Sequence, residues 1–137
     1  MSKKKIICVW IGTFELENEF YQDYMKFNYD KEDSISKFGI DIGLDFYDED
    51  YIESWWFEKL EINHLMECQE SLLDSNYFFG ELITELKKRN LTNKNFISFL
   101  FGEIGTHPAN EILFEYIGTK STEKSIEFVF RKEYEIT

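Results

Sequence analysis

The chain has 137 residues, is 43% hydrophobic and 18% aromatic, and carries a formal net charge of −12 at pH 7. This length suits one domain with a sizeable core, and the hydrophobic content excludes a disordered chain. The negative charge disfavours nucleic-acid binding and attachment to anionic membranes, because both need cationic surface. We therefore expect residues 1–137 to form a single domain whose charged partners are basic.

The first half of the chain predicts one buried strand followed by helices. Residues 5–14 include a β-branched and aromatic run around Trp10 and predict a core strand. Residues 15–27 carry apolar side chains at helical spacing and predict an amphipathic helix. These side chains are Leu16, Phe20, Tyr24 and Phe27. A short helix is expected from Asp33 to Gly39, whereas residues 40–50 favour no regular structure.

The middle of the chain predicts two further helices. Residues 51–57 fit either a helix or a strand. Residues 62–73 predict a helix with Asn63 as its N-cap. Residues 75–90 predict a longer helix that begins at Ser75 and buries Phe78, Leu82, Ile83 and Leu86.

The last third of the chain predicts strands. Residues 95–101 are apolar on both faces apart from Ser98, which places this strand centrally in a sheet. Residues 111–117 and 125–134 alternate, with Ile126, Phe128 and Phe130 expected on one face. The predicted fold is therefore α+β: a mostly antiparallel sheet of about four strands, with helices packed on one face.

Acidic and aromatic residues alternate densely between positions 41 and 61. The carboxylates are Asp41, Asp45, Asp48, Glu49, Asp50, Glu53, Glu58 and Glu61, and the one base is Lys59. The aromatic residues are Phe46, Tyr47, Tyr51, Trp55, Trp56 and Phe57. Negative charge steers a cationic partner, and large aromatic side chains anchor interfaces. This segment therefore predicts a protein-binding surface, although the same aromatic side chains could instead pack the helices onto the sheet.

No catalytic or cofactor motif is evident in the sequence. The chain has neither a phosphate-binding glycine loop nor a serine or cysteine in a nucleophile pattern. His64 and Cys68 share the spacing of two zinc ligands, but a structural zinc site needs four. We therefore expect a protein that is not an enzyme and that holds neither a metal nor another cofactor. Cys8 and Cys68 fit reduced thiols.

Two segments resemble a known family. Residues 9–14, Val-Trp-Ile-Gly-Thr-Phe, followed by an acidic amphipathic helix, resemble the N-terminal signature of the immunity-protein-22 family. Residues 46–53, Phe-Tyr-Asp-Glu-Asp-Tyr-Ile-Glu, resemble its internal aromatic-acidic motif. The resemblance implies an immunity protein of a bacterial polymorphic toxin system. Such a protein stays in the cytoplasm and blocks a cognate toxin domain, whose gene usually lies beside its own.

The predicted function is therefore the neutralisation of a toxin domain by direct binding. The toxin is expected to be basic, and the acidity of the chain favours a nuclease. The partner-binding residues that we predict are Asp45, Tyr47, Asp48, Glu49, Asp50, Tyr51, Glu53, Trp55 and Trp56. Two alternatives remain open at this stage: an acidic regulatory adaptor for another basic protein, and a small carboxylate-based metal-binding module. The absence of a signal-peptide pattern and of a long apolar segment favours a cytoplasmic location.

Overall fold

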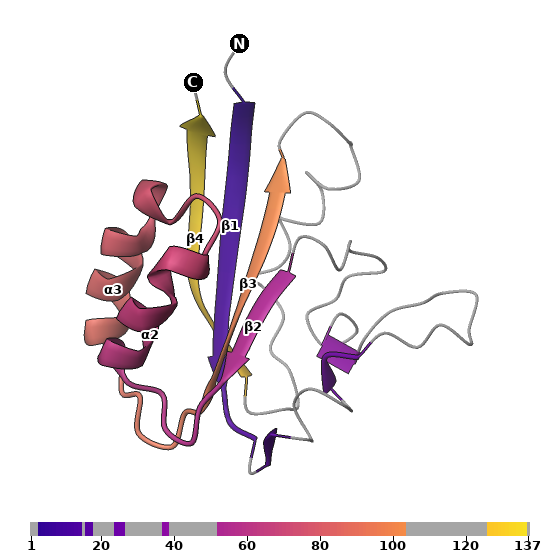
Figure 1. The fold of residues 1–137 in the computed structure, drawn as a ribbon, viewed down its shortest axis with the longest axis vertical. Coiled ribbons are helices and arrows are strands. Elements are labelled where there is room, and N and C mark those ends of the chain that lie inside the picture. Colours follow the sequence, from indigo (N-terminus) through magenta and orange to yellow (C-terminus); the bar gives the residue numbers. More distant parts are fainter. Residues whose placement is uncertain are drawn as a thin grey trace, which may run out of the picture.

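The computed structural model describes residues 3–14, 16–17, 24–26, 37–38, 52–103 and 126–136. Within these residues, β1 (Lys3–Gly12), β2 (Ile52–Trp56), β3 (Phe96–Glu103) and β4 (Ile126–Ile136) form an antiparallel sheet in the order β2-β3-β1-β4. Helices α2 (Ile62–Cys68) and α3 (Phe79–Lys87) lie on one side of this sheet (Figure 1). The predicted α+β class, with helices on one face, is confirmed.

The hydrophobic runs located the strands well. The predicted central strand is β3, which lies between β2 and β1. The segment that fitted either helix or strand forms β2. The predicted strand at 111–117 lies outside the described residues, as does most of the predicted helices at 15–27 and 33–39. Of the expected apolar face in 15–27, Tyr24 is buried, whereas Leu16 is 60% exposed.

Both predicted caps of the middle helices are wrong. The chain is extended at Glu61, so α2 starts at Ile62 with Asn63 already inside it. The reason is that the Leu60 N–H donates to the Lys94 carbonyl, which keeps the chain on the sheet until that point. At Cys68 the α-helix gives way to a short 3₁₀ helix, Gln69–Ser71, so the predicted helix at 62–73 is shorter than expected.

The predicted helix at 75–90 is also broken. Asp74 adopts a left-handed conformation with φ 55°, and Ser75–Tyr77 form a separate 3₁₀ helix. Phe78, with φ −142° and ψ −15°, is neither helical nor extended and separates this turn from α3. Phe78 and Phe79 are both buried, although neighbours on an α-helix point about 100° apart. The break therefore allows both rings to enter the core.

Each face of the sheet carries its own core. On the helix side, β1 contributes Ile7, Val9 and Ile11, which pack with Leu65 and Leu82 from the two helices. On the opposite side, the alternate β1 residues Ile6, Cys8 and Trp10 pack with other buried residues. These are Phe14, Tyr24, Phe38, Phe96 and Leu100. A strand buried on both faces reads as an unbroken apolar run, which explains the sequence of β1.

The expected alternation of β4 is interrupted by a bulge. Val9 is paired with Phe130 and Trp10 with Phe128, so Val129 is the extra residue. Phe128 consequently packs on the core opposite the helices, whereas Val129 and Phe130 belong to the helix side. The prediction that Phe128 and Phe130 share a face is therefore wrong, because one inserted residue shifts the pattern by one position.

A polar cluster joins the helical layer to the sheet. The Lys5 ammonium lies 3.0 Å from the Asp74 carboxylate, and the Tyr134 hydroxyl donates to the same oxygen at 2.9 Å. Burial and then this hydrogen bond raise the pKa of Tyr134, which keeps it a neutral donor. Asp74 immediately precedes the turn into α3, so the cluster fixes this turn against β1 and β4.

Asn95 joins three strands where β1, β2 and β3 meet. Its backbone N–H donates to the Gly12 carbonyl at 2.9 Å, and its carbonyl accepts from the Phe57 N–H at 2.8 Å. Its side-chain oxygen accepts from the Phe14 N–H at 2.7 Å, and its side-chain amide donates to the Phe14 carbonyl. One buried residue thereby fixes the end of β1, the end of β2 and the start of β3.

Replacing Asn95 by alanine should lower the free energy of unfolding by about 2–3 kcal/mol, because it removes both hydrogen bonds to the buried Phe14 backbone. Urea denaturation followed by circular dichroism measures this. Asn90→Ala is the matched control, because exposed Asn90 makes one local bond to the Thr92 N–H. A loss at Asn95 no larger than that at Asn90 would contradict the assigned role.

Candidate partner-binding surface

Strand β2 lies at one edge of the sheet formed by the described residues. It pairs with β3 in the register Ile52↔Leu100 to Trp56↔Phe96. Ser54 and Ser98 are opposite each other, and their hydroxyls are 2.9 Å apart. Within the described part of the chain β2 pairs along one side only, and all five of its residues are half-buried.

The neighbouring tryptophans point to opposite faces, as expected for a strand. Trp55 packs on the helix side, with its ring centroid 5.6 Å from that of Phe99 in a T-shaped contact. Trp56 packs on the other core, and its indole N–H donates to the Phe14 carbonyl at 3.2 Å. Trp56 therefore binds the same Phe14 backbone that Asn95 binds, whereas the ring contact between Trp55 and Phe99 is apolar.

Glu53 is the acidic residue of β2 and pairs with Phe99 in the register. Its Oε2 atom is buried and has no hydrogen-bond partner among the described residues. Desolvation raises the pKa of this carboxyl above its ordinary value. A charged oxygen without a donor is a cost to the stability of the free protein.

The other predicted contact residues lie outside the described residues. They are Asp45, Tyr47, Asp48, Glu49, Asp50 and Tyr51. The structure therefore places three of the predicted residues, Glu53, Trp55 and Trp56, on one strand. The contact role of the whole set stays a prediction.

His64 makes two local contacts that bear on its position. The His64 ring stacks on Phe57 with centroids 5.1 Å apart, and its Nδ1 lies 3.0 Å from the Lys59 carbonyl. Across the described part of the chain, no group of three or more His, Cys, Asp or Glu side chains is arranged to hold a metal ion. Both cysteines are free thiols, and burial raises the pKa of each. These two contacts connect the first turn of α2 to the residues that follow β2.

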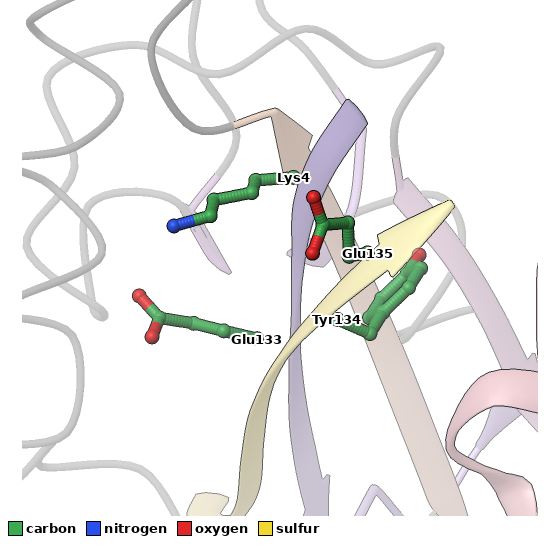
Figure 2. A pocket seen from close by; sticks show the side chains of 4 residues that line it. All are labelled: Lys4, Glu133, Tyr134 and Glu135. Atoms are coloured by element: carbon green, nitrogen blue, oxygen red, sulfur yellow. The ribbon is translucent and has the colours of Figure 1, made fainter. Parts of the chain in front are cut away.

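A small polar pocket lies at the other side of the sheet and was not predicted from the sequence. Its volume is about 260 Å³, and it is lined by Lys4, Glu133, Tyr134 and Glu135 (Figure 2). The Lys4 and Glu133 side chains extend away from the strands, whereas the Tyr134 ring points to the opposite side, where it meets Asp74. The pocket provides one ammonium and two carboxylates in water-accessible positions, which is a charged surface feature without a nucleophile.

Comparison with known proteins identifies the family of this chain. A family model described as Immunity protein 22 matches residues 7–129, which is nearly the whole chain. The chain belongs to this family. Neither the curated proteins nor the solved structures gave a match. The resemblance seen in two short motifs is thus confirmed over the strands and helices that follow them.

Membership of the immunity family supports an immunity function and implies a toxin as the partner in general. The family is generally non-enzymatic, which agrees with the expectation that the protein is a binder. In the described ranges, no helix has the length and apolar character needed to cross a bilayer.

Glu53→Gln should stabilise the free protein at neutral pH. The folded-state pKa of Glu53 lies above its ordinary value of 4.5, so the folded state binds the proton more tightly than the unfolded state. The stability of the wild type should therefore fall as the pH rises from about 4.5 through the folded-state pKa, and the glutamine variant should lack this part of the fall.

Urea midpoints of both proteins across this pH range measure the effect. Glu70→Gln, at an exposed position, controls for the loss of one negative charge. Identical pH profiles for Glu53→Gln and the wild type would show that the Glu53 carboxylate is not penalised by burial.

Proposed function

We propose that this immunity protein binds a cognate basic toxin domain directly and neutralises it through an acidic and aromatic surface. The surface comprises Asp45, Tyr47, Asp48, Glu49, Asp50, Tyr51, Glu53, Trp55 and Trp56. The observation that carries the proposal is the Glu53 carboxylate, which lies on β2 two residues before Trp55 and lacks a donor for its buried oxygen among the described residues. A lysine or arginine from the toxin supplies that donor.

The charge of the chain supports a cationic partner. Residues 1–80 contain 18 acids and 7 bases, whereas residues 81–137 contain 9 acids and 8 bases. The excess of negative charge therefore belongs to the first 80 residues, which include the proposed surface. Complementary charge raises association rates above the roughly 10⁵–10⁶ M⁻¹s⁻¹ of neutral pairs, and rapid capture suits an inhibitor that must reach a toxin before it acts.

A nuclease is the toxin class that best fits this chemistry. A nuclease needs a cationic cleft to hold phosphates, and closely spaced carboxylates can occupy such a cleft in their place. Asp48, Glu49 and Asp50 provide three consecutive carboxylates for this role. The aromatic residues beside them supply apolar contact area, which charges alone do not provide.

The proposal is tested by expressing the toxin domain encoded beside the gene in bacteria, with and without this protein. We expect the wild type to restore growth. Reversal of Asp48, Glu49 and Asp50 to lysine should abolish the rescue, because it replaces attraction by repulsion. Reversal of the exposed Glu17, Glu133 and Glu135 is the control of equal charge change. Failure of the wild type to rescue, or equal effects of both triple variants, would refute the proposal.

The two tryptophans should separate a binding role from a folding role. Trp56→Ala should lower the free energy of unfolding by about 2–4 kcal/mol, because it empties core volume and removes the bond to Phe14. Trp55→Ala should weaken toxin binding by about tenfold or more, as expected for an interface anchor, with a smaller loss of stability. Calorimetric titration measures toxin binding, and thermal unfolding measures stability. If Trp55→Ala lost more stability and Trp56→Ala lost more binding, Trp55 would have the folding role and Trp56 the binding role.

A further inference from the structure

The outward surface of α2 and its 3₁₀ extension combines apolar and acidic side chains. Leu65 and Leu72 are buried in the helix-side core. Asn63, Met66, Glu67 and Glu70 are exposed, and their spacing of three or four residues places them along one stripe of the helix. Leu73 follows this stripe in the chain. The segment therefore presents exposed apolar and acidic side chains that the core does not use.

Two large apolar side chains on this face are open to solvent. Met66 is 56% exposed and Leu73 is 46% exposed. Among the described residues, Leu16 is the only other large apolar side chain that is this exposed. Leu72 is the residue of this pair that is buried in the core, and Leu73 is exposed to solvent. Exposed apolar side chains gathered in one segment and bordered by charge are typical of interaction surfaces, and methionine adapts well to a partner.

The charges around these two residues are one-sided. Residues 58–86 contain seven acids and one base. The acids are Glu58, Glu61, Glu67, Glu70, Asp74, Glu81 and Glu85, and the base is Lys59. Four of the acids form ion pairs: Glu61 with Lys59, Asp74 with Lys5, Glu81 with Lys132 and Glu85 with Arg89. Glu67 and Glu70 form no ion pair with any described residue, so their charges stay available to a partner.

We propose that Met66, Glu67, Glu70 and Leu73 form a second docking surface for the same basic toxin domain. This inference rests on the proposed function and extends it from β2 onto α2. The two carboxylates attract a cationic surface, and the two apolar side chains lose their contact with water when it docks.

Other occupants fit this surface less well. A second copy of the chain would place Glu67 and Glu70 against carboxylates of the same face, because a two-fold contact matches each patch with itself. A nucleic acid or an anionic membrane would meet the same repulsion. A protein with exposed lysines or arginines satisfies both carboxylates and covers both apolar side chains.

The position of α2 relative to β2 is fixed by contacts. Phe57 stacks on His64, and the His64 ring nitrogen contacts the Lys59 carbonyl, so the strand end and the first helical turn move together. Trp55 and Phe57 pack against the same core as Leu65. The α2 segment lies on one side of the sheet (Figure 1), and Trp55 packs into the core of that same side. We expect one toxin domain to contact both surfaces without a change in the fold.

The test uses a catalytically inactive form of the toxin domain that the protein neutralises, with binding followed by biolayer interferometry. Glu67→Lys with Glu70→Lys should raise Kd by about tenfold or more, mainly through kon, and should reduce the salt dependence. Met66→Ser with Leu73→Ser should raise koff by about tenfold. Glu133→Lys with Glu135→Lys has the same charge change on the opposite sheet face and should alter Kd by less than about twofold. Thermal unfolding verifies that each variant is folded.

The outcomes separate the two proposals. If the Asp48, Glu49 and Asp50 reversal weakens binding while both α2 variants bind like the control, the α2 surface is refuted and the proposed function stands. If the α2 variants weaken binding and the control does not, the α2 surface is supported. A wild type that suppresses no toxin overturns both, because the second proposal depends on the first.

Discussion

The buried hydrogen bonds of Asn95 are the constraint on which the candidate surface depends. Asn95 satisfies the backbone of Gly12, Phe14 and Phe57, so it holds β1, β2 and β3 at one corner of the sheet. In an apolar interior, each of these groups would be costly to leave without a partner. The edge strand β2 is short, and a five-residue strand has few ladder bonds of its own. Its position is therefore determined largely by this corner, where Trp56 adds its own bond to the Phe14 carbonyl.

This corner also orders β2, the strand that carries the proposed contact residues Glu53 and Trp55. Trp56 is anchored in one core and cannot move without breaking its bond to Phe14, and this anchoring fixes which face Glu53 and Trp55 occupy. A surface whose side chains are already ordered loses less conformational entropy when a partner docks. The two neighbouring tryptophans thus have different physical roles, since the indole N–H of one holds the fold and the ring of the other lies against Phe99 near the sheet edge.

The sequence was informative where the physical cause is local. The apolar runs of β1 and β3 identified both strands and the central position of β3, because burial on two faces leaves a pattern within the strand itself. The cap at Ser75 was wrong, because the helix start depends on burying Phe78 and Phe79 together. The role of Asn95 was not predicted, because its partners Gly12 and Phe14 lie more than 80 residues away in the chain. Likewise, the spacing of acids suggested Glu53 as a contact, but its desolvation follows from strand register, which a single sequence does not reveal.

The acidic residues divide into two physical groups. Asp74 and Glu81 contact lysines of the sheet, and Glu85 and Glu127 contact Arg89, which follows α3. The pairs of Asp74, Glu81 and Glu127 help to hold the helical layer on the strands. Glu53, Glu67 and Glu70 form no ion pair within the described residues and belong to β2 and the α2 segment, which follow each other in the chain. Unpaired carboxylates repel one another and lower the stability of the free protein. A cationic partner reduces this repulsion when it binds the unpaired carboxylates. It gains less from carboxylates that already form ion pairs within the protein. The ion pairs of Asp74, Glu81 and Glu127 therefore connect the helical layer to the strands, whereas Glu53, Glu67 and Glu70 carry charge that no described residue neutralises.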